Sequence, residues 1–237
     1  MSRNLQGIAN YSWSHSIDNG SGDFDPAAPA SIVPVQENRG QSAFDVRHSF
    51  SGAVTYAIPP PAGQRFLRAL AENWMVDGIF VARTGFPIDV ITSRISGLIN
   101  PLFVAPTRPD LVPGEPIYIA DSTAPGGRVL NRAAFSIPSP PRQGNLGRNS
   151  IPGFGMWQAD FAVQRKVHLT ERVALQIRSD IFNVFNHPNF ANPDGNLDEG
   201  SLFGRSSQAL NRGLGGLSAL YQAGGPRSVQ LSLKLIF

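Results

Sequence analysis

The final stretch of the chain, R-S-V-Q-L-S-L-K-L-I-F (227–237), decides its fold. Apolar and polar side chains alternate along it, and successive side chains of a β-strand point to opposite faces of the sheet. The apolar set is Val229, Leu231, Leu233, Leu235 and Phe237. Such a strand, ending on an aromatic residue, is typical of a membrane barrel whose apolar face meets lipid. Taken alone, it fits the last strand of a soluble β-sandwich equally well.

Composition supports a β protein and excludes several classes of function. The chain has 237 residues, enough for one sizeable β domain, and its 24 Gly and 20 Pro favour strands joined by irregular loops. The absence of Cys excludes disulfides and thiol chemistry. A net charge of +3 without a run of like charges predicts no nucleic-acid partner.

We find no recognisable targeting or transmembrane segment in this sequence. No apolar run approaches the length of a transmembrane helix, and the first residues, M-S-R-N-L-Q-G (1–7), lack the apolar core of a secretory signal. If the protein acts outside the cytoplasm, we therefore expect this chain to be a fragment of a longer one.

Five other stretches alternate like the last one. They are residues 4–17, 44–58, 74–90, 156–167 and 172–186. Each can supply the roughly 9–11 residues that a tilted strand needs to cross a bilayer. Their connections run long, short, long, short, long, and the long ones are 18–42, 91–155 and 187–226. This alternation predicts an all-β, antiparallel, up-and-down barrel segment of about six strands, with its long loops extracellular.

Aromatic residues test this interpretation independently. Trp13 and Trp157 are expected near the outer ends of their strands, and Tyr56 and Trp74 near the inner ends. Trp and Tyr gather at membrane interfaces because an apolar ring carries a polar group that seeks water. We therefore predict these four residues to be interface aromatics, a pattern that favours the membrane barrel over the sandwich.

Charged residues fall on the polar parity of the strands, which would face the lumen. They include Asp45, Arg47, Asp160, Arg178, Asp180 and Lys234. On the lipid face each charge would cost about 2–4 kcal/mol at the midplane. We expect Asp160, Arg178 and Asp180 to form a structural ion network across adjacent strands, with a substrate contact as the alternative. A solvated sheet face is the bland explanation of the whole set.

No constellation for catalysis or metal binding is present. The four His residues are far apart in sequence, and the usual protease, phosphate-loop and nucleophile motifs are missing. Residues 194–199 begin like a calcium loop but have Glu199 where Gly is expected, so a solvated loop is favoured. We predict no enzyme, no cofactor and no metal site.

An ordered series of segments resembles the end of TonB-dependent outer-membrane receptors, and most closely their Oar-like branch. The segments are F-D-V-R-H-S-F (44–50), R-T-G-F-P (83–87), R-P-D-L-V-P-G (108–114), V-L-N-R-A-A-F-S-I-P (129–138), G-N-L-G-R-N-S (144–150), W-Q-A-D-F-A-V-Q-R-K (157–166), I-F-N-V-F-N-H-P-N-F (181–190) and the terminal 224–237. The likeness covers most of the chain after about residue 40, and the ordered series is more specific than any one piece.

This resemblance implies a role and a set of partners. Residues 1–237 would be the C-terminal portion of a 22-stranded barrel, with the plug domain and signal peptide absent from this chain. The whole receptor would lie in the outer membrane of a Gram-negative-type bacterium and take up, or interact with, a bulky extracellular ligand, energised by the TonB complex. Its partners would be outer-membrane lipid, the remaining barrel and plug, and the barrel-assembly machinery, which would read the terminal strand. The alternative is a secreted soluble β-sandwich for binding or adhesion.

Overall fold

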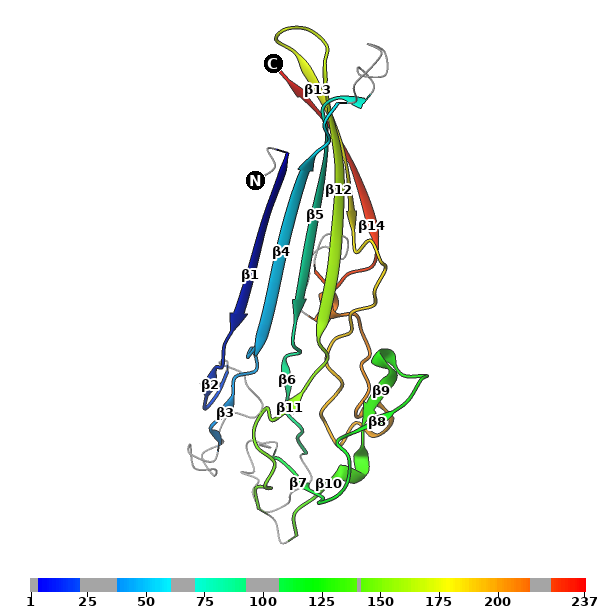
Figure 1. Ribbon diagram of the computed structural model, residues 1–237. Helices are drawn as coiled ribbons and strands as arrows, with labels where there is room; N and C mark the ends of the chain where they lie inside the picture. The colour runs from blue at the N-terminus through cyan, green and yellow to red at the C-terminus, as the bar shows by residue number, and fades with distance from the viewer. Residues whose placement is uncertain (1–3, 22–37, 61–70, 93–106, 140–141, 214–222) are drawn as a thin grey trace.

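The computed structural model describes residues 4–21, 38–60, 71–92, 107–139, 142–213 and 223–237, and is built on one six-stranded sheet (Figure 1). Its strands are β1 (Leu5–Trp13), β4 (His48–Ala57), β5 (Trp74–Arg83), β12 (Met156–His168), β13 (Ala174–Phe182) and β14 (Ser228–Ile236). They lie side by side in chain order, each antiparallel to the next. The predicted all-β, up-and-down arrangement is confirmed. Among the described residues the sheet is open, with β1 and β14 at its edges.

The connections alternate between the two ends of the sheet. The turn between β12 and β13 is tight, because the N–H groups of Leu169 and Thr170 both donate to the carbonyl oxygen of Val173. It lies at the same end as the connection between β4 and β5 (Figure 1). The three long connections all lie at the opposite end, in the order that the sequence predicts.

The strands are shorter than the alternation predicted, and polar turns explain the difference. Asp45 and Arg47, expected within a strand, precede β4, because the Asp45 N–H bonds to the Ser42 carbonyl in a turn (2.9 Å). β5 ends before Gly85, where the backbone passes too close to Gly153 for any Cβ. β13 ends at Phe182 because Asn183 adopts a left-handed conformation (φ 49°). The sequence of residues 65–73 would also permit a turn or two of helix, but most of this stretch lies outside the described residues.

The register separates an apolar face from a polar one. One row across the sheet reads Gly7, Val54, Gly78, Phe161, Ile181 and Val229, and the next row reads Gln6, Thr55, Asp77, Ala162, Asp180 and Gln230. On the apolar face Leu231 is 78% exposed, Val54 46% and Phe161 37%. No described segment covers these side chains, whereas a sandwich would bury them beneath a second sheet, so the described residues give that alternative no support.

The sequence suggested that the long connections are simple loops, but the structure shows local order within them. They contain four small ladders: β2 (Ile17–Asp18) with β3 (Gly40–Gln41), β6 (Pro87–Ile88) with β11 (Ile151–Pro152), β7 (Asp110–Leu111) with β10 (Phe135–Ser136), and β8 (Tyr118–Ala120) with β9 (Arg128–Leu130). The described residues of these connections also include the helical turns η2 (Pro125–Gly127), η3 (Arg132–Ala134), η4 (Gly200–Leu202) and α2 (Leu210–Gly213). Within the described ranges no helix has the length and hydropathy to span a membrane.

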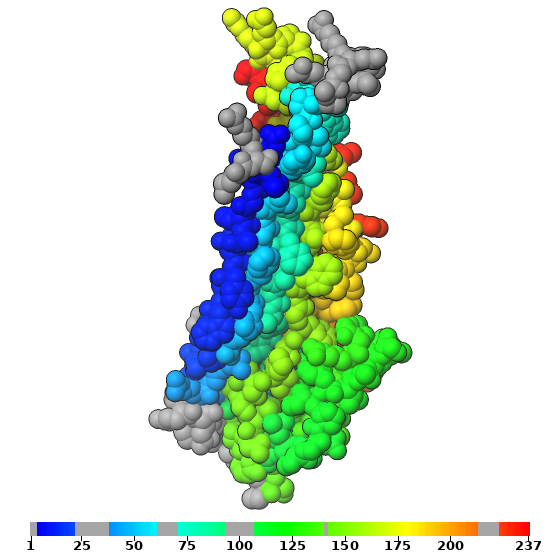
Figure 2. Space-filling view, viewed as in Figure 1, coloured from blue at the N-terminus to red at the C-terminus, as the bar shows by residue number. Residues whose placement is uncertain are grey.

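The hydrophobic core of the described chain lies in these connections and not in the sheet. It consists of Ile88, Val90, Leu130, Ala134, Phe135, Leu146, Ile151, Leu197 and Phe203. The residues come from the described segments 84–92, 107–139, 142–155 and 183–213, which together we call the loop unit. Its side chains gather in one mass at the end of the sheet (Figure 2). The loop unit is therefore a packed structure that holds a fixed surface beyond the strands.

Candidate functional site

Four polar side chains form a ladder across the polar face of the sheet. Arg178 of β13 donates from Nε to Asp180 Oδ1 (2.8 Å) and from Nη1 to Asp77 Oδ2 (2.9 Å). Thr55 of β4 donates to the other oxygen of Asp77 (2.8 Å). Arg178 reaches Asp77 across β12 at Ala162, which is only 5% exposed. The ionic ladder, Thr55–Asp77–Arg178–Asp180, thus ties strands that do not all pair directly.

The other predicted lumen charges are placed separately. Asp160 accepts hydrogen bonds from Gln158 Nε2 and the Asn183 N–H, both at 2.8 Å, and is not a member of the ladder. Lys234 of β14 is exposed and lies opposite Gln176 of β13. The structure thus brings together two of the three residues expected to cluster, Arg178 and Asp180, and adds Asp77. That these charges face a lumen stays a prediction.

Replacing Ala162 with leucine is expected to lower the free energy of unfolding by about 1–3 kcal/mol, because the larger side chain blocks the path of Arg178 and overpacks the site. Chemical unfolding in lipid vesicles measures this loss. The matched control is Ala159→Leu on the apolar face, where the side chain lines an open hollow and the expected change is within about 0.5 kcal/mol. Equal losses in the two variants would contradict the ladder's contribution.

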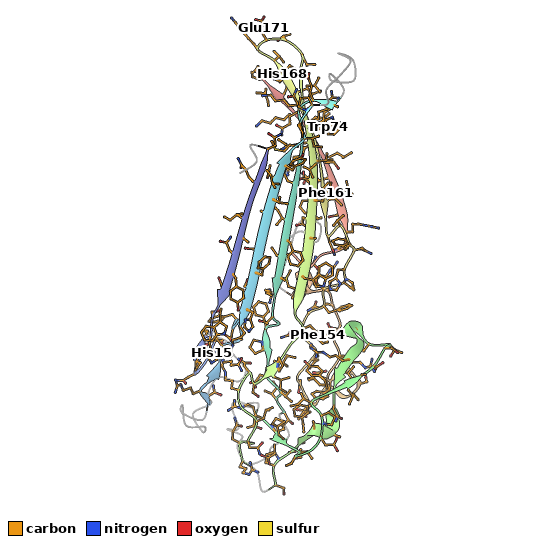
Figure 3. All side chains as sticks on the ribbon, viewed as in Figure 1. His15, Trp74, Phe154, Phe161, His168 and Glu171 are labelled. Carbon is orange, nitrogen blue, oxygen red and sulfur yellow. The ribbon has the colours of Figure 1, made fainter. Side chains whose placement is uncertain are left out.

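The predicted interface aromatics lie at opposite ends of the strands. Trp13 ends β1 opposite His48, and Trp157 is near the start of β12. Tyr56 is next to the end of β4, and Trp74 begins β5. Figure 3 shows Trp74 near His168 and the turn that carries Glu171, with His15 at the other end and Phe161 between. The positions along the strands match the prediction, while contact with the membrane interface stays a prediction.

Sequence reasoning missed further members of this pattern. At the end near Trp157, ring centroids form a chain from Phe50 to Phe80 (6.0 Å), to Trp157 (6.2 Å) and to His187 (4.1 Å). At the other end, the Arg165 guanidinium lies on the apolar face over the Trp74 ring (5.5 Å). The parity of each strand holds this signal, but only the register aligns the rings.

The terminal strand presents its apolar residues outward. Val229, Leu231, Leu233, Leu235 and Phe237 are all exposed, and β14 forms an edge of the sheet. Phe237 follows the last paired residue, Ile236. The arrangement is compatible with a segment recognised during assembly, and that role stays a prediction.

Buried arginines join the first long connection to the loop unit. Arg148 has no exposed side-chain surface and forms an ion pair with Asp18, while its Nη2 donates to Ser21 Oγ (2.8 Å). Arg108 donates to Asn38 Oδ1 (2.8 Å). Burial raises the pKa of Asp18, but hydrogen bonds from Ser42, Arg148 and Ser21 outweigh it and hold the pKa below its usual value. Segments 14–21 and 38–47 are therefore fastened to the loop unit.

Contacts inside the loop unit join its two long segments. Asn192 Nδ2 donates to the Phe86 carbonyl (3.0 Å), and Arg205 Nη2 to Asp121 Oδ2 (2.7 Å). In the predicted calcium-like stretch, Asp194 and Asn196 accept bonds from backbone N–H groups two residues on. Their oxygens stabilise local turns, and no metal-binding group of three His, Asp or Glu side chains occurs in the described part of the chain.

Tyr118 is a partly buried phenol of the loop unit. Its hydroxyl donates to the Pro152 carbonyl (2.9 Å), and the Arg128 guanidinium lies over its ring (4.2 Å). Burial raises the pKa of Tyr118 from 10.0 to about 12, and the charge of Arg128 opposes this only in part. The fold therefore favours the neutral phenol.

An alkaline titration tests this environment. Because the folded pKa of Tyr118 is raised, the stability that it contributes is complete below pH 10 and is lost as pH rises through about 12. Phenolate absorbance should show one tyrosine fewer ionised in the folded than in the unfolded protein between these values. Tyr118→Phe should abolish that difference, and an unchanged difference would assign it to another tyrosine.

Comparison with known proteins gives one match. The family model for an outer membrane beta barrel domain matches residues 1–230. No curated protein and no solved structure matches the chain.

Proposed function

Given that this chain belongs to the outer membrane beta barrel domain family, we propose that it is the C-terminal part of a TonB-dependent receptor of the Oar-like branch. The family places the chain in the outer membrane, and we propose that the exposed apolar face of the sheet meets lipid there. The finer assignment is supported by the ordered series of receptor-like segments from about residue 40 to Phe237.

The open sheet supports membership of a larger barrel. Among the described strands, β1 and β14 are each paired on one side only. Unpaired N–H and C=O groups cost several kcal/mol each in hydrocarbon, so both edges need partner strands. We propose that the rest of a 22-stranded barrel supplies them, that a plug domain fills the lumen against the ionic ladder, and that the barrel-assembly machinery reads β14.

The function proposed is energised uptake of, or interaction with, a bulky extracellular ligand. The observation that carries it is the loop unit, because a packed core built from the second and third long connections holds a large surface in place. A surface organised before binding loses less conformational entropy when a ligand docks. The energy would come from the TonB complex through parts outside this chain, and the chain itself would catalyse no reaction.

Capture by TonB tests the proposal. The full-length parent protein, solubilised from outer membranes in detergent, should bind the purified periplasmic domain of TonB, whereas residues 1–237 alone should not. Heat-shifted mobility of the parent on a gel verifies that the barrel is folded. A folded, heat-modifiable parent that TonB does not capture would leave an outer-membrane barrel but overturn the receptor assignment.

A further inference from the structure

A cavity of about 590 Å³ opens where β1 and β4 leave the sheet, between the first long connection and residues 147–150. Its lining includes His15, Arg39, Arg47, Arg148, Gln41 and Ser150. None of the described residues that line it is acidic. His15 marks its place near the short strands β2 and β3 in Figure 3. The cavity is therefore polar, basic and open to the outer end of the sheet.

Among the described residues, positive charge exceeds negative charge around this cavity. Asp45, which is buried, accepts a bond from the Ser16 N–H (2.7 Å) and is shared by His15 Nδ1 (3.4 Å) and Arg47 Nη2 (3.5 Å). Arg148 is neutralised by Asp18. Arg39 is exposed, and the described part of the chain records no ion pair for it. One carboxylate, that of Asp45, is thus shared by two basic side chains, His15 and Arg47, and Arg39 adds a further positive charge to the cavity.

The cavity also lies at a defined position along the strands, just beyond the aromatic residues at their ends. His15 is two residues beyond Trp13, and Arg47 precedes His48, the register partner of Trp13. Ile17 of the lining is 46% exposed. Basic groups directly beyond aromatic residues at a strand end occupy the level where lipid headgroups meet water.

We propose that this cavity binds a phosphate group. The planar guanidinium of arginine matches phosphate with paired hydrogen bonds, and Arg39 and Arg47 both have exposed surface to offer. The Ser150 hydroxyl and Gln41 amide of the lining supply further donors. The phosphate belongs to an outer-leaflet headgroup or to a soluble compound. The inference uses only the outer-membrane location and is independent of the proposed transport.

The test compares two probes on the full-length protein from outer membranes, exchanged into phosphate-free detergent. Inorganic phosphate is titrated by calorimetry, and retained phosphatidic acid is counted by native mass spectrometry. Arg39→Gln combined with Arg47→Gln should weaken binding by at least about tenfold, through lost charge-assisted bonds. Arg172→Gln, an exposed arginine at the β12–β13 turn, is the control and should change nothing.

The two probes distinguish a soluble phosphate compound from a lipid headgroup as the ligand of the cavity. Binding of inorganic phosphate alone assigns the site to a soluble compound, retention of phosphatidic acid alone assigns it to a lipid, and loss of either in the double variant supports the site. If neither probe binds, or if the double variant and Arg172→Gln behave alike, the proposal is overturned. Heat-shifted mobility verifies folding. Should the double variant fail to fold, Arg39→Gln alone gives the same reading, because Arg39 is exposed and no described ion pair is lost with it.

Discussion

Leu231→Arg is expected to destabilise the folded barrel by about 2–4 kcal/mol, the cost of a charge at the midplane of the lipid face. Leu231 lies in the middle of β14, is 78% exposed, and shares the apolar face with Phe161 and Val54. We propose that hydrocarbon covers this exposed surface in the outer membrane, where a guanidinium would have no partner. Unfolding by guanidinium chloride in lipid vesicles, with the heat-shifted fraction as readout, measures the loss.

Gln230→Arg is the matched control for this substitution. It adds the same side chain one residue earlier in β14, on the polar face, where the register partner is Asp180. An arginine there gains an acidic neighbour and remains in a wet environment, so the expected change is within about 0.5 kcal/mol. Equal effects of Leu231→Arg and Gln230→Arg would show that the two faces meet the same solvent, and the assignment of the lipid face would fall.

Arg148→Ala is expected to lower the stability of the outer end by about 2–3 kcal/mol and to release residues 14–21 and 38–47 from the loop unit. The side chain has no exposed surface, and its removal leaves Asp18, Ser21 and the Gln41 carbonyl without their shared donor. Breaking a buried ion pair costs about 3–5 kcal/mol, and the figure is lower here because Asp18 is 24% exposed. Limited proteolysis should cut the first connection early while β12 and β13 remain intact.

Arg142→Ala supplies the comparison, because Arg142 lies in the same long connection as Arg148, residues 91–155. Arg142 also pairs with a carboxylate, Asp110, but its side chain is 52% exposed. Exposed pairs contribute little to stability because solvent screens them, so the proteolysis pattern should stay that of the unmodified protein. If Arg142→Ala released the first connection as readily as Arg148→Ala, the fastening would depend on net charge and not on the buried contact.

The sheet could be predicted from the sequence because period-two alternation is a local signal. The alternation of β14 and β12 identifies both faces without knowledge of any neighbour. The strand ends could not be predicted as well, since Asp45 continues the alternation but its N–H bonds back to Ser42. Side-chain partners depend on register, and so the contact between Asp77 and Arg178, from strands separated by β12, was outside the reach of the pattern.

The loop unit was the largest feature that the sequence did not predict. Its core draws Val90, Leu130 and Phe203 from separate stretches rich in Gly and Pro, and no helical or strand period links them. Such a core is specified by long-range packing, and long aperiodic segments give no local sign of it. The basic cavity was missed for the same reason, because His15, Arg39 and Ser150 meet only when two connections are folded together.

In the proposed orientation two solvents act on this one chain, because its buried core would lie on the aqueous side of the bilayer. Val90 and Leu130 are held together by exclusion from water, which brings a positive heat-capacity change on melting and sensitivity to urea. Leu231 is exposed and would face lipid tails, so that driving force would be missing between it and its surroundings. Calorimetry on vesicles should accordingly resolve two separate transitions. Urea should shift the transition of the loop unit far more than the transition of the six-stranded sheet.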